Sequence, residues 1–419
     1  MFYNNIKKFF LRITNFNLTV LDQVLVSGSN FLISILILRF LGINDFGVFS
    51  FYWLILTLIN GAQISFVISP MFTNAPKQNK LNIDFFYGGV FFQQIIFTSI
   101  VFFFFILFFK FFGTYNFDYQ FQSYYFQFSL TIIVTQLHQF ARRLLFSKNL
   151  YFKALISDFT TYFSLIFFLF YFDVLKLLTL ENVWWIFFYS FLLGIMINFT
   201  IILSLKFNYL SIYSTIKTNW IIGKWLLLTT ITQWFSGNLW LLNAAILLGP
   251  FIFGIIRACQ TLLNISNIIF QSIENFIPAT TSEKFKVGGI RTMKNYLKSF
   301  TIKYLKIIIL VVFVIILFSK NLLSLFYGSE VATYYQILIY LSFIIPIQFL
   351  QYPLIYKFRT LGNTKPIFFS FLFAAFFSLI SSKFIFNYFD IQGLIFGLYT
   401  SQFIVVISLY LIDYRKKDY

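Results

Sequence analysis

The chain has 419 residues, of which 59% are hydrophobic and only 11% are charged, and its mean hydropathy is +0.82. Apolar runs of about 20 residues recur along its whole length, which excludes a soluble globular domain and predicts an all-α, polytopic membrane protein. A single cysteine and a single histidine exclude an intrachain disulfide and metal sites built from several Cys or His ligands.

Twelve apolar segments predict twelve transmembrane helices. Their positions, each to within a few residues, are 18–39, 47–69, 86–109, 124–145, 154–175, 183–205, 222–248, 251–278, 302–319, 333–355, 366–387 and 391–412. With this assignment, 25 of the 31 Lys and Arg residues lie in connections on the side of the N-terminus, and 5 lie in the opposite connections. The positive-inside rule then places both termini in the cytoplasm. The net charge of +18 therefore reflects membrane topology rather than a nucleic-acid partner.

Two stretches with the pattern LGxxxFG, residues 41–47 and 248–254, lie 207 residues apart. Each lies at the predicted outer turn between the first and second helices of one half of the chain. Because six spans per half preserve the orientation, the two repeats are parallel. We therefore expect a six-helix lobe at 1–210, a cytoplasmic linker at 211–221 and a second six-helix lobe at 222–419, arranged around a central cavity as in a transporter.

Polar residues recur in the predicted eighth helix, residues 249–278, at spacings of three and four. They are Arg257, Gln260, Asn264, Asn267, Gln271 and Glu274. On a continuous α-helix this spacing places all of them on one face. Unpaired polar groups are costly in hydrocarbon, so the face is expected to line a hydrated cavity or a helix contact inside the bundle.

The first and seventh predicted helices carry similar polar stripes. The first has Gln23, Ser27, Asn30 and Ser34 on one face with Asp22 beside them, and the seventh has Thr229, Gln233, Ser236, Trp240 and Asn243, with Asn238 nearby. Small residues at this spacing indicate close helix packing. Together with the eighth helix, the stripes equally indicate three walls of one hydrophilic cleft, with Asn30, Gln233 and Asn238 among the candidate substrate contacts.

A family resemblance lies in residues 223–278, which read GKWLLLTTITQWFSGNLWLLNAAILLGPFIFGIIRACQTLLNISNIIFQSIENFIP. The QW-SGN helix, the LGP turn, the G-x-x-RA-x-Q segment and the EN-x-x-P end resemble the polysaccharide-transporter family, the Wzx-type oligosaccharide-lipid flippases. Asp22-Gln23 and the LGINDFG turn resemble the first hairpin of that family. The family belongs to a superfamily that also includes multidrug exporters, and these motifs do not specify the substrate.

The resemblance implies a flippase rather than an enzyme. Its cargo would be undecaprenyl-pyrophosphate-linked oligosaccharide, moved to the outer leaflet of the bacterial cytoplasmic membrane for O-antigen, capsule or related surface polysaccharide. The implied partners are this lipid-linked oligosaccharide, membrane lipids, a polysaccharide polymerase and a chain-length regulator.

Basic residues are the candidates for contacts with the anionic pyrophosphate. Arg257 is the first, because a buried guanidinium keeps its charge and can bind phosphate bidentately. Arg142, Arg143 and Lys224 lie near cytoplasmic helix ends, where they would capture headgroups or simply anchor the helices. Arg39 lies near the outer end of the first helix, as an exit contact or a snorkelling side chain.

Three carboxyl groups at or within predicted spans, those of Asp22, Asp158 and Glu274, are candidates for coupling transport to protons or sodium. The alternative is that each forms a salt bridge. We expect no other cofactor.

Two other functions remain open. An ion-coupled multidrug antiporter of the same fold should have an acidic cavity, which the arginine in the stripe disfavours. A membrane polysaccharide polymerase or glycosyltransferase usually needs a large outer loop or paired acidic residues, and here the predicted outer loops are short. The sequence has no GxxxxGK[ST] motif, so this chain is not itself a nucleotide-driven pump.

Overall fold

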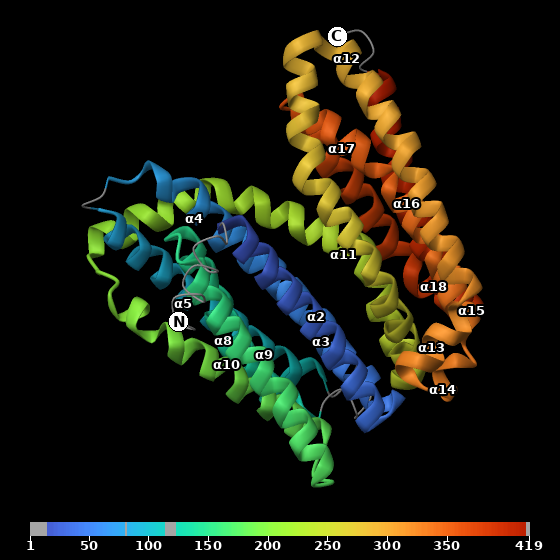
Figure 1. Ribbon diagram of the computed structural model, residues 1–419, viewed down its shortest axis with the longest axis horizontal. Helices are drawn as coiled ribbons and strands as arrows, with labels where there is room; N and C mark the ends of the chain where they lie inside the picture. Colours follow the sequence, from blue (N-terminus) through green and yellow to red (C-terminus); the bar gives the residue numbers. More distant parts are fainter. Residues whose placement is uncertain (1–14, 80–81, 114–122, 416–419) are drawn as a thin grey trace, which may run out of the picture. The chain divides into compact units, whose positions relative to one another are not determined.

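The computed structural model describes residues 15–79, 82–113 and 123–415, and every regular element in these ranges is helical. The prediction of an all-α fold is therefore confirmed for this part of the chain. Nine of the described helices are long and apolar enough to cross a membrane. The described helices form two compact units, and the helices α3 and α11 contribute to both (Figure 1).

The first unit comprises the described residues up to Gly42 and Tyr52–Thr230. Its elements are α2 (Asn15–Leu41), most of α3 (Ile43–Gln63), the π-helical turn η1 (Ile64–Ile68), α4 (Ser69–Asn74), η2 (Ala75–Lys77), α5 (Ile83–Phe108), η3 (Phe109–Gly113), α8 (Tyr125–Ser147), α9 (Tyr151–Val174), α10 (Leu180–Leu203) and the start of α11 (Tyr209–Leu263).

The second unit comprises Ile43–Phe51 and the described residues from Ile231 onward. Its elements are the start of α3, the remainder of α11, the 3-10 turn η4 (Asn264–Ser266), α12 (Asn267–Leu317), α13 (Ser319–Tyr327), α14 (Ser329–Ala332), α15 (Tyr335–Ser342), α16 (Ile344–Phe349), α17 (Gln351–Thr360) and α18 (Lys365–Arg415).

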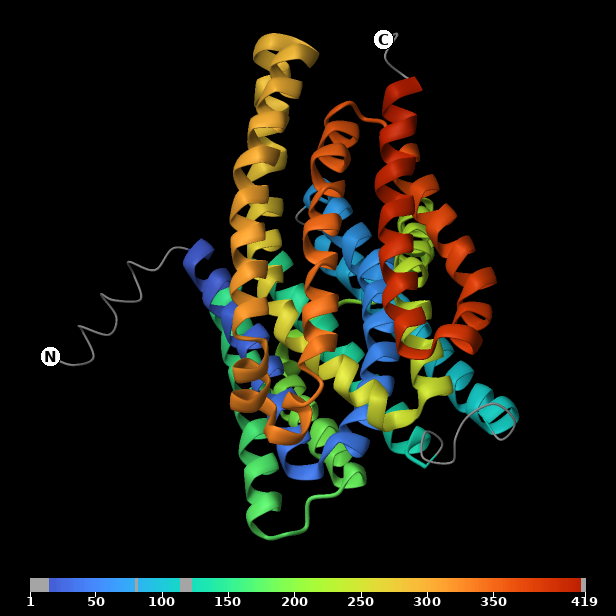
Figure 2. The ribbon, with the colours of Figure 1, turned by 90° about the vertical axis from the view of Figure 1, so that its right-hand side faces the viewer.

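The twelve predicted spans fall largely on described helical elements, although some helices contain two spans and the span 333–355 is divided among α15, α16 and α17. Helix α11 breaks at Gly249, where φ is 75°, and α18 breaks at Asp390, where φ is 45°. Helix α12 turns back on itself at Gly288 and Gly289, where a sharp bend joins its two halves (Figure 1, Figure 2). Only glycine adopts a positive φ without strain, which explains two of these three reversals.

The predicted helix at 249–278 is not continuous, which corrects the sequence-based interpretation. The 3-10 turn η4 separates α11 from α12 at Asn264–Ser266. A 3-10 turn has about 3.0 residues per turn, so polar residues on its two sides do not share the single face that a continuous α-helix would give them. The predicted linker at 211–221 is also helical, since it forms part of α11, and the limits of the two lobes stay a prediction.

The two LGxxxFG repeats cross each other within the second unit. Gly42 and Gly249 have nearly the same backbone conformation, with φ 85°, ψ 177° and φ 75°, ψ 173°. A Cβ atom on Gly47 would collide with the carbonyl oxygen of Pro250, and one on Gly254 would collide with that of Ile43. Because residues 43 and 47 correspond to 250 and 254, exchanging the repeats converts one contact into the other. The repeats are thus related by a local two-fold axis where they touch.

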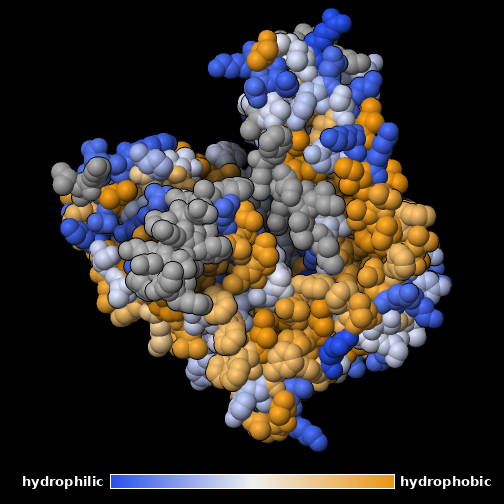
Figure 3. Space-filling view, viewed as in Figure 1, coloured by the Kyte–Doolittle hydropathy of each residue, from blue (hydrophilic) through white to orange (hydrophobic). Residues whose placement is uncertain are grey.

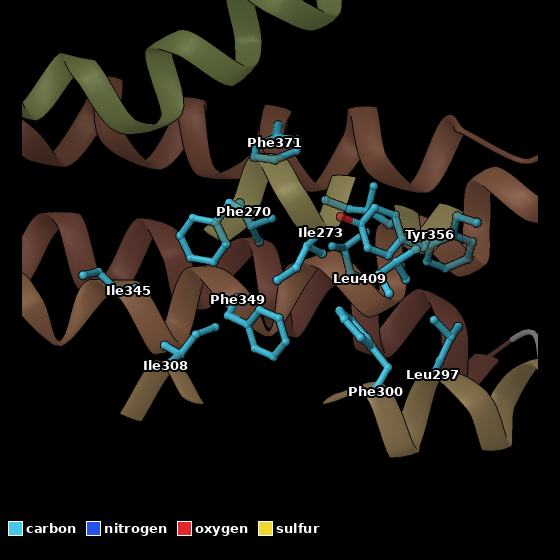
Figure 4. Packing of buried hydrophobic residues seen from close by; sticks show 14 of the residues in the cluster. Phe270, Ile273, Leu297, Phe300, Ile308, Ile345, Phe349, Tyr356, Phe371 and Leu409 are labelled. Carbon is cyan, nitrogen blue, oxygen red and sulfur yellow. The ribbon is translucent and has the colours of Figure 1, made fainter. Parts of the chain in front are cut away.

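Aromatic and aliphatic side chains form the core of each unit. In the first unit, the rings of Tyr52, Phe128 and Trp184 pack with centroids 4.7–5.5 Å apart. In the second, Figure 4 shows Phe349 packing against Phe300, whose ring centroid lies 5.6 Å away. Large apolar side chains also cover much of the surface (Figure 3), as lipid-facing helices require.

Candidate functional site

A polar cavity of about 230 Å³ lies inside the second unit, between α11, η4, α15 and α16. Its polar lining comes from Arg257, Gln260 and Asn264 of the predicted stripe and from Asn238, Ser266 and Gln348. Apolar side chains such as Phe270 and Ile345, which also belong to the core in Figure 4, close the remaining wall. The first half of the stripe therefore lines a cavity inside one unit.

Arg257 is the charged group of this cavity. Its Nη1 donates a hydrogen bond of 2.9 Å to the Oε1 of Gln260, one helical turn later. Its Nε is buried without a hydrogen-bond partner. In the described part of the chain no carboxylate forms an ion pair with Arg257. A partly buried guanidinium without a carboxylate partner favours the binding of an anion in this cavity.

The flanking sequence explains why Arg257 faces the cavity. Its neighbours Ile255, Ile256, Ala258 and Cys259 are fully buried and fix the apolar faces of this turn of α11. The hydroxyl of Thr261 donates a 2.8 Å hydrogen bond to the carbonyl oxygen of Arg257, which keeps the helix regular up to η4. The guanidinium can then point only along the remaining face, toward Gln260 and Asn264.

A second polar cluster is buried in the first unit around Arg142 of α8. Its Nη2 donates a hydrogen bond to Asp22 of α2. Its Nε lies 2.5 Å from Oδ2 of Asp158 on α9, an ion pair in which the N–H does not point along the contact. His138 Nε2 lies 3.5 Å from Oδ1 of the same Asp158. The side chains of these residues are at most 5% exposed.

Neutral hydrogen bonds extend this cluster toward α10. The hydroxyls of Ser157 and Thr161 lie 3.2 and 3.0 Å from Nε2 of His138. Asn198 donates a 2.7 Å hydrogen bond to the Ser157 hydroxyl. A Cβ on Gly194 would collide with Thr161 and approach the His138 ring, so this glycine lets α10 come close enough to complete the network.

The remaining predicted residues are dispersed. Glu274 forms an ion pair with Arg359 of α17 at a half-exposed position, and Asn30 hydrogen bonds to Tyr162 in the first unit. Lys224 lies 5.8 Å from the centre of the Trp225 ring. Three further candidates belong neither to the cavity lining nor to the contacts described around Arg142. Arg143 is half-buried and follows Arg142 in the chain, and Arg39 and Gln233 are exposed. The side chains of Asn267 and Gln271 lie outside the described ones.

Two features were missed by the sequence analysis. Gln348 lines the cavity, and its only signal was that it is one of three glutamines, with Gln336 and Gln351, in the apolar segment 333–355. Trp240 was assigned to a polar stripe, yet it is fully buried and its Nε1 donates to the hydroxyls of Ser378 and Ser401 of α18, at 2.9 and 2.8 Å.

Comparison with known proteins shows the fold. No family model matches the chain, and no curated protein matches it at the sequence level. Among solved structures, it resembles an inward-facing multidrug resistance MATE-family transporter of the MOP superfamily with a TM-score of 0.78 and 10% identity, over 94% of both chains. It also resembles the lipid II flippase MurJ in an inward closed conformation, with a TM-score of 0.68 and 14% identity, over 96% of this chain and 87% of that one.

A third similar structure is a MOP superfamily transporter from Pyrococcus furiosus Vc1 described as having a binding pocket of reversed polarity. Its TM-score is 0.63 and its identity is 11%, over 94% of this chain and 93% of that one. At these identities the comparisons show that this chain has the fold of MOP-superfamily transporters, and the substrate must be inferred from the chain's own residues.

Proposed function

We propose that this chain is a flippase that moves a lipid-linked oligosaccharide with an anionic pyrophosphate across the bacterial cytoplasmic membrane, for O-antigen, capsule or related surface polysaccharide. The observation that carries the proposal is Arg257, a partly buried guanidinium that lines a polar cavity of a transporter fold, with no carboxylate partner among the described residues. On the charge distribution of the sequence, both termini face the cytoplasm.

The lining of the cavity suits the polar part of such a substrate. The guanidinium offers paired N–H groups to phosphate oxygens, and burial strengthens that contact relative to water. The amides of Asn238, Gln260, Asn264 and Gln348 both donate and accept, as hydroxyl groups of a glycan require. The apolar tail of the lipid needs no protein cavity, since the hydrocarbon of the bilayer already surrounds it.

The test replaces Arg257 with Lys, Gln and Ala and measures export of surface glycan in a deletion strain. Arg257→Lys should keep part of the activity, because the charge remains while the bidentate geometry is lost. Arg257→Gln and Arg257→Ala should abolish export, accumulate lipid-linked glycan on the cytoplasmic side and leave the amount of folded protein unchanged. Lys176→Gln, an exposed position in the connection after α9, is the matched control. Normal surface glycan in a well-expressed Arg257→Ala strain rejects the proposal.

An ion-coupled multidrug antiporter of the same fold is the second candidate. The observation that favours it is the pair of buried carboxylates, Asp22 and Asp158, in the first unit. This function predicts that deletion raises sensitivity to cationic drugs and leaves surface glycan unchanged. The flippase predicts the opposite pattern, so the same deletion strain separates the two.

A further inference from the structure

A second cavity, in the first unit, has no role in the function proposed so far. It has a volume of about 600 Å³, within the range of about 300–1,000 Å³ of small-molecule sites. It lies between the segment that leads into α5 and the first turns of α11. Its lining consists of uncharged amides, hydroxyls and aromatic rings: Gln78, Asn82, Asn208, Ser214, Thr218 and Phe85 are the main contributors.

The walls of this cavity are held rigidly. A Cβ on Gly88 of α5 would collide with the carbonyl oxygen of Lys206, and one on Gly89 would come 2.7 Å from the Thr215 hydroxyl. Next along α11 from the lining residue Thr218, Asn219 accepts a 3.0 Å hydrogen bond from Asn74 and donates a 2.9 Å bond to Gln93. These contacts hold α4, α5 and α11 together, so the cavity is already formed without a ligand. A preformed cavity loses less conformational entropy when a ligand binds.

Two lysines supply positive charge beside this neutral lining. The Nζ of Lys206 lies 5.9 Å from the centre of the Phe85 ring, which itself lines the cavity. The Nζ of Lys77 lies 3.4 Å from Oδ1 of Asn74, at the end of the buried amide chain. Neither lysine forms an ion pair with a carboxylate in the ranges that the structure covers. Two exposed lysines therefore lie near a cavity whose own lining side chains are uncharged.

We propose that this cavity binds a phosphate ester that carries several hydroxyl groups, with Lys206 contacting the phosphate and the hydroxyls and amides of the lining contacting the hydroxyl-bearing part. The hydroxyl groups of Ser214 and Thr218 donate to helix carbonyl oxygens, and the lone pairs of their own oxygens can accept a hydrogen bond from a ligand. Phe85 offers an aromatic face to the C–H surface of a sugar ring. This inference rests on the proposed function, in which the ligand is the phospho-sugar headgroup of the cargo before transport.

A phosphate ester with hydroxyl groups could also be the glycerophosphate headgroup of an anionic phospholipid. Binding of soluble probes to the purified full-length protein separates the two. The probes are glucose 1-phosphate, glycerol 1-phosphate and glucose, titrated in an Arg257→Ala background so that the cavity of the second unit does not contribute. Glucose 1-phosphate should bind most tightly, and glucose alone should bind at least tenfold more weakly.

Two variants and one control complete the test. Lys206→Gln should weaken glucose 1-phosphate binding about tenfold, the scale of one charge-assisted hydrogen bond. Thr218→Val should reduce the preference for glucose 1-phosphate over glycerol 1-phosphate. Lys153→Gln, an exposed change on α9 of the same unit, should alter neither.

Two results of these binding measurements would contradict the proposal, each in a different part. Equal binding of wild type and Lys206→Gln for every probe overturns the proposal. Equal affinity for glycerol 1-phosphate and glucose 1-phosphate overturns its assignment to a sugar headgroup in favour of a phospholipid. Because the assay measures binding without transport, failure of the flippase function in the glycan-export test leaves this result readable by itself.

Discussion

Replacing Arg142 with Gln tests whether the buried cluster of the first unit stabilises the fold or couples transport to an ion. Arg142 connects α8 with Asp22 of α2 and Asp158 of α9. The carboxylate side chains are 1% and 0% exposed, and the arginine side chain is 5% exposed. The substitution leaves both carboxylates buried without their counter-charge.

The expected loss of stability follows from this burial. Breaking a buried ion pair by removing one partner costs about 3–5 kcal/mol, because the remaining charge stays desolvated. The two ion pairs share one guanidinium and are not additive. With a shift of about 2–4 °C per kcal/mol for a unit of this size, the midpoint of thermal unfolding should fall by roughly 10 °C.

Neutralising the carboxylates should reverse that loss. The triple variant Arg142→Gln, Asp22→Asn, Asp158→Asn contains no buried charge at these positions, so its unfolding midpoint should return most of the way to that of the wild type. The measurement is thermal unfolding of the purified, detergent-solubilised variants, with Lys153→Gln as the exposed control. An unchanged midpoint for Arg142→Gln, or a triple variant less stable than the single one, would refute the reasoning.

The same triple variant reports on ion coupling. If Asp22 and Asp158 serve only as partners of Arg142, glycan export returns together with stability. If either carboxylate also carries a coupling proton or sodium ion, stability returns and export does not, because an amide cannot bind a proton or an ion at that site with comparable affinity.

Three further outcomes are expected. Gly47→Ala should lose folded, monodisperse protein in size-exclusion chromatography, since its Cβ has no space at the crossing of the repeats, whereas Gly28→Ala should be tolerated because nothing lies within 4 Å of its Cβ. Trp240→Phe should lower the free energy of unfolding by about 1–3 kcal/mol, because two buried serine hydroxyls lose their shared donor. Lys286→Cys in a Cys259→Ser background should react with a membrane-impermeant maleimide only after the membrane is opened, and labelling from outside would contradict the predicted topology.

The helix positions could be predicted because hydropathy and charge act locally along the chain. A span is recognisable from its own 20 or so residues, and the turns at Gly42 and Gly249 were recognisable because the same LGxxxFG pattern occurs at both. The interruption at Asn264–Ser266 was not predictable in this way. Nothing in its composition distinguishes it from the helix on either side, since it contains neither glycine nor proline.

The sequence limits which charged residues can form ion pairs, but it does not show which pairs form. The sequence left open a salt bridge for Asp22 and for Asp158, and in the structure both carboxylates pair with Arg142. Asp22 lies 120 residues from Arg142 in the chain, so only the packing of α2 and α9 around α8 decides the pairing. Likewise the partner of Glu274 is Arg359 of α17, 85 residues away.

The contrast between Arg142, which is buried, and Arg257, which is partly buried, connects stability with function. The charge of Arg142 is compensated within its own unit by two carboxylates, so its removal should first reduce stability. Arg257 has an amide and a cavity beside it and, among the described residues, no carboxylate, so the fold does not depend on a partner that its removal would leave unpaired. Replacing this partly buried guanidinium, which has no carboxylate partner among the described residues, with Gln should therefore leave the unfolding midpoint unchanged or raise it. A loss of export in Arg257→Gln at full stability, beside a loss of stability in Arg142→Gln, would assign the anion-binding role to the second unit.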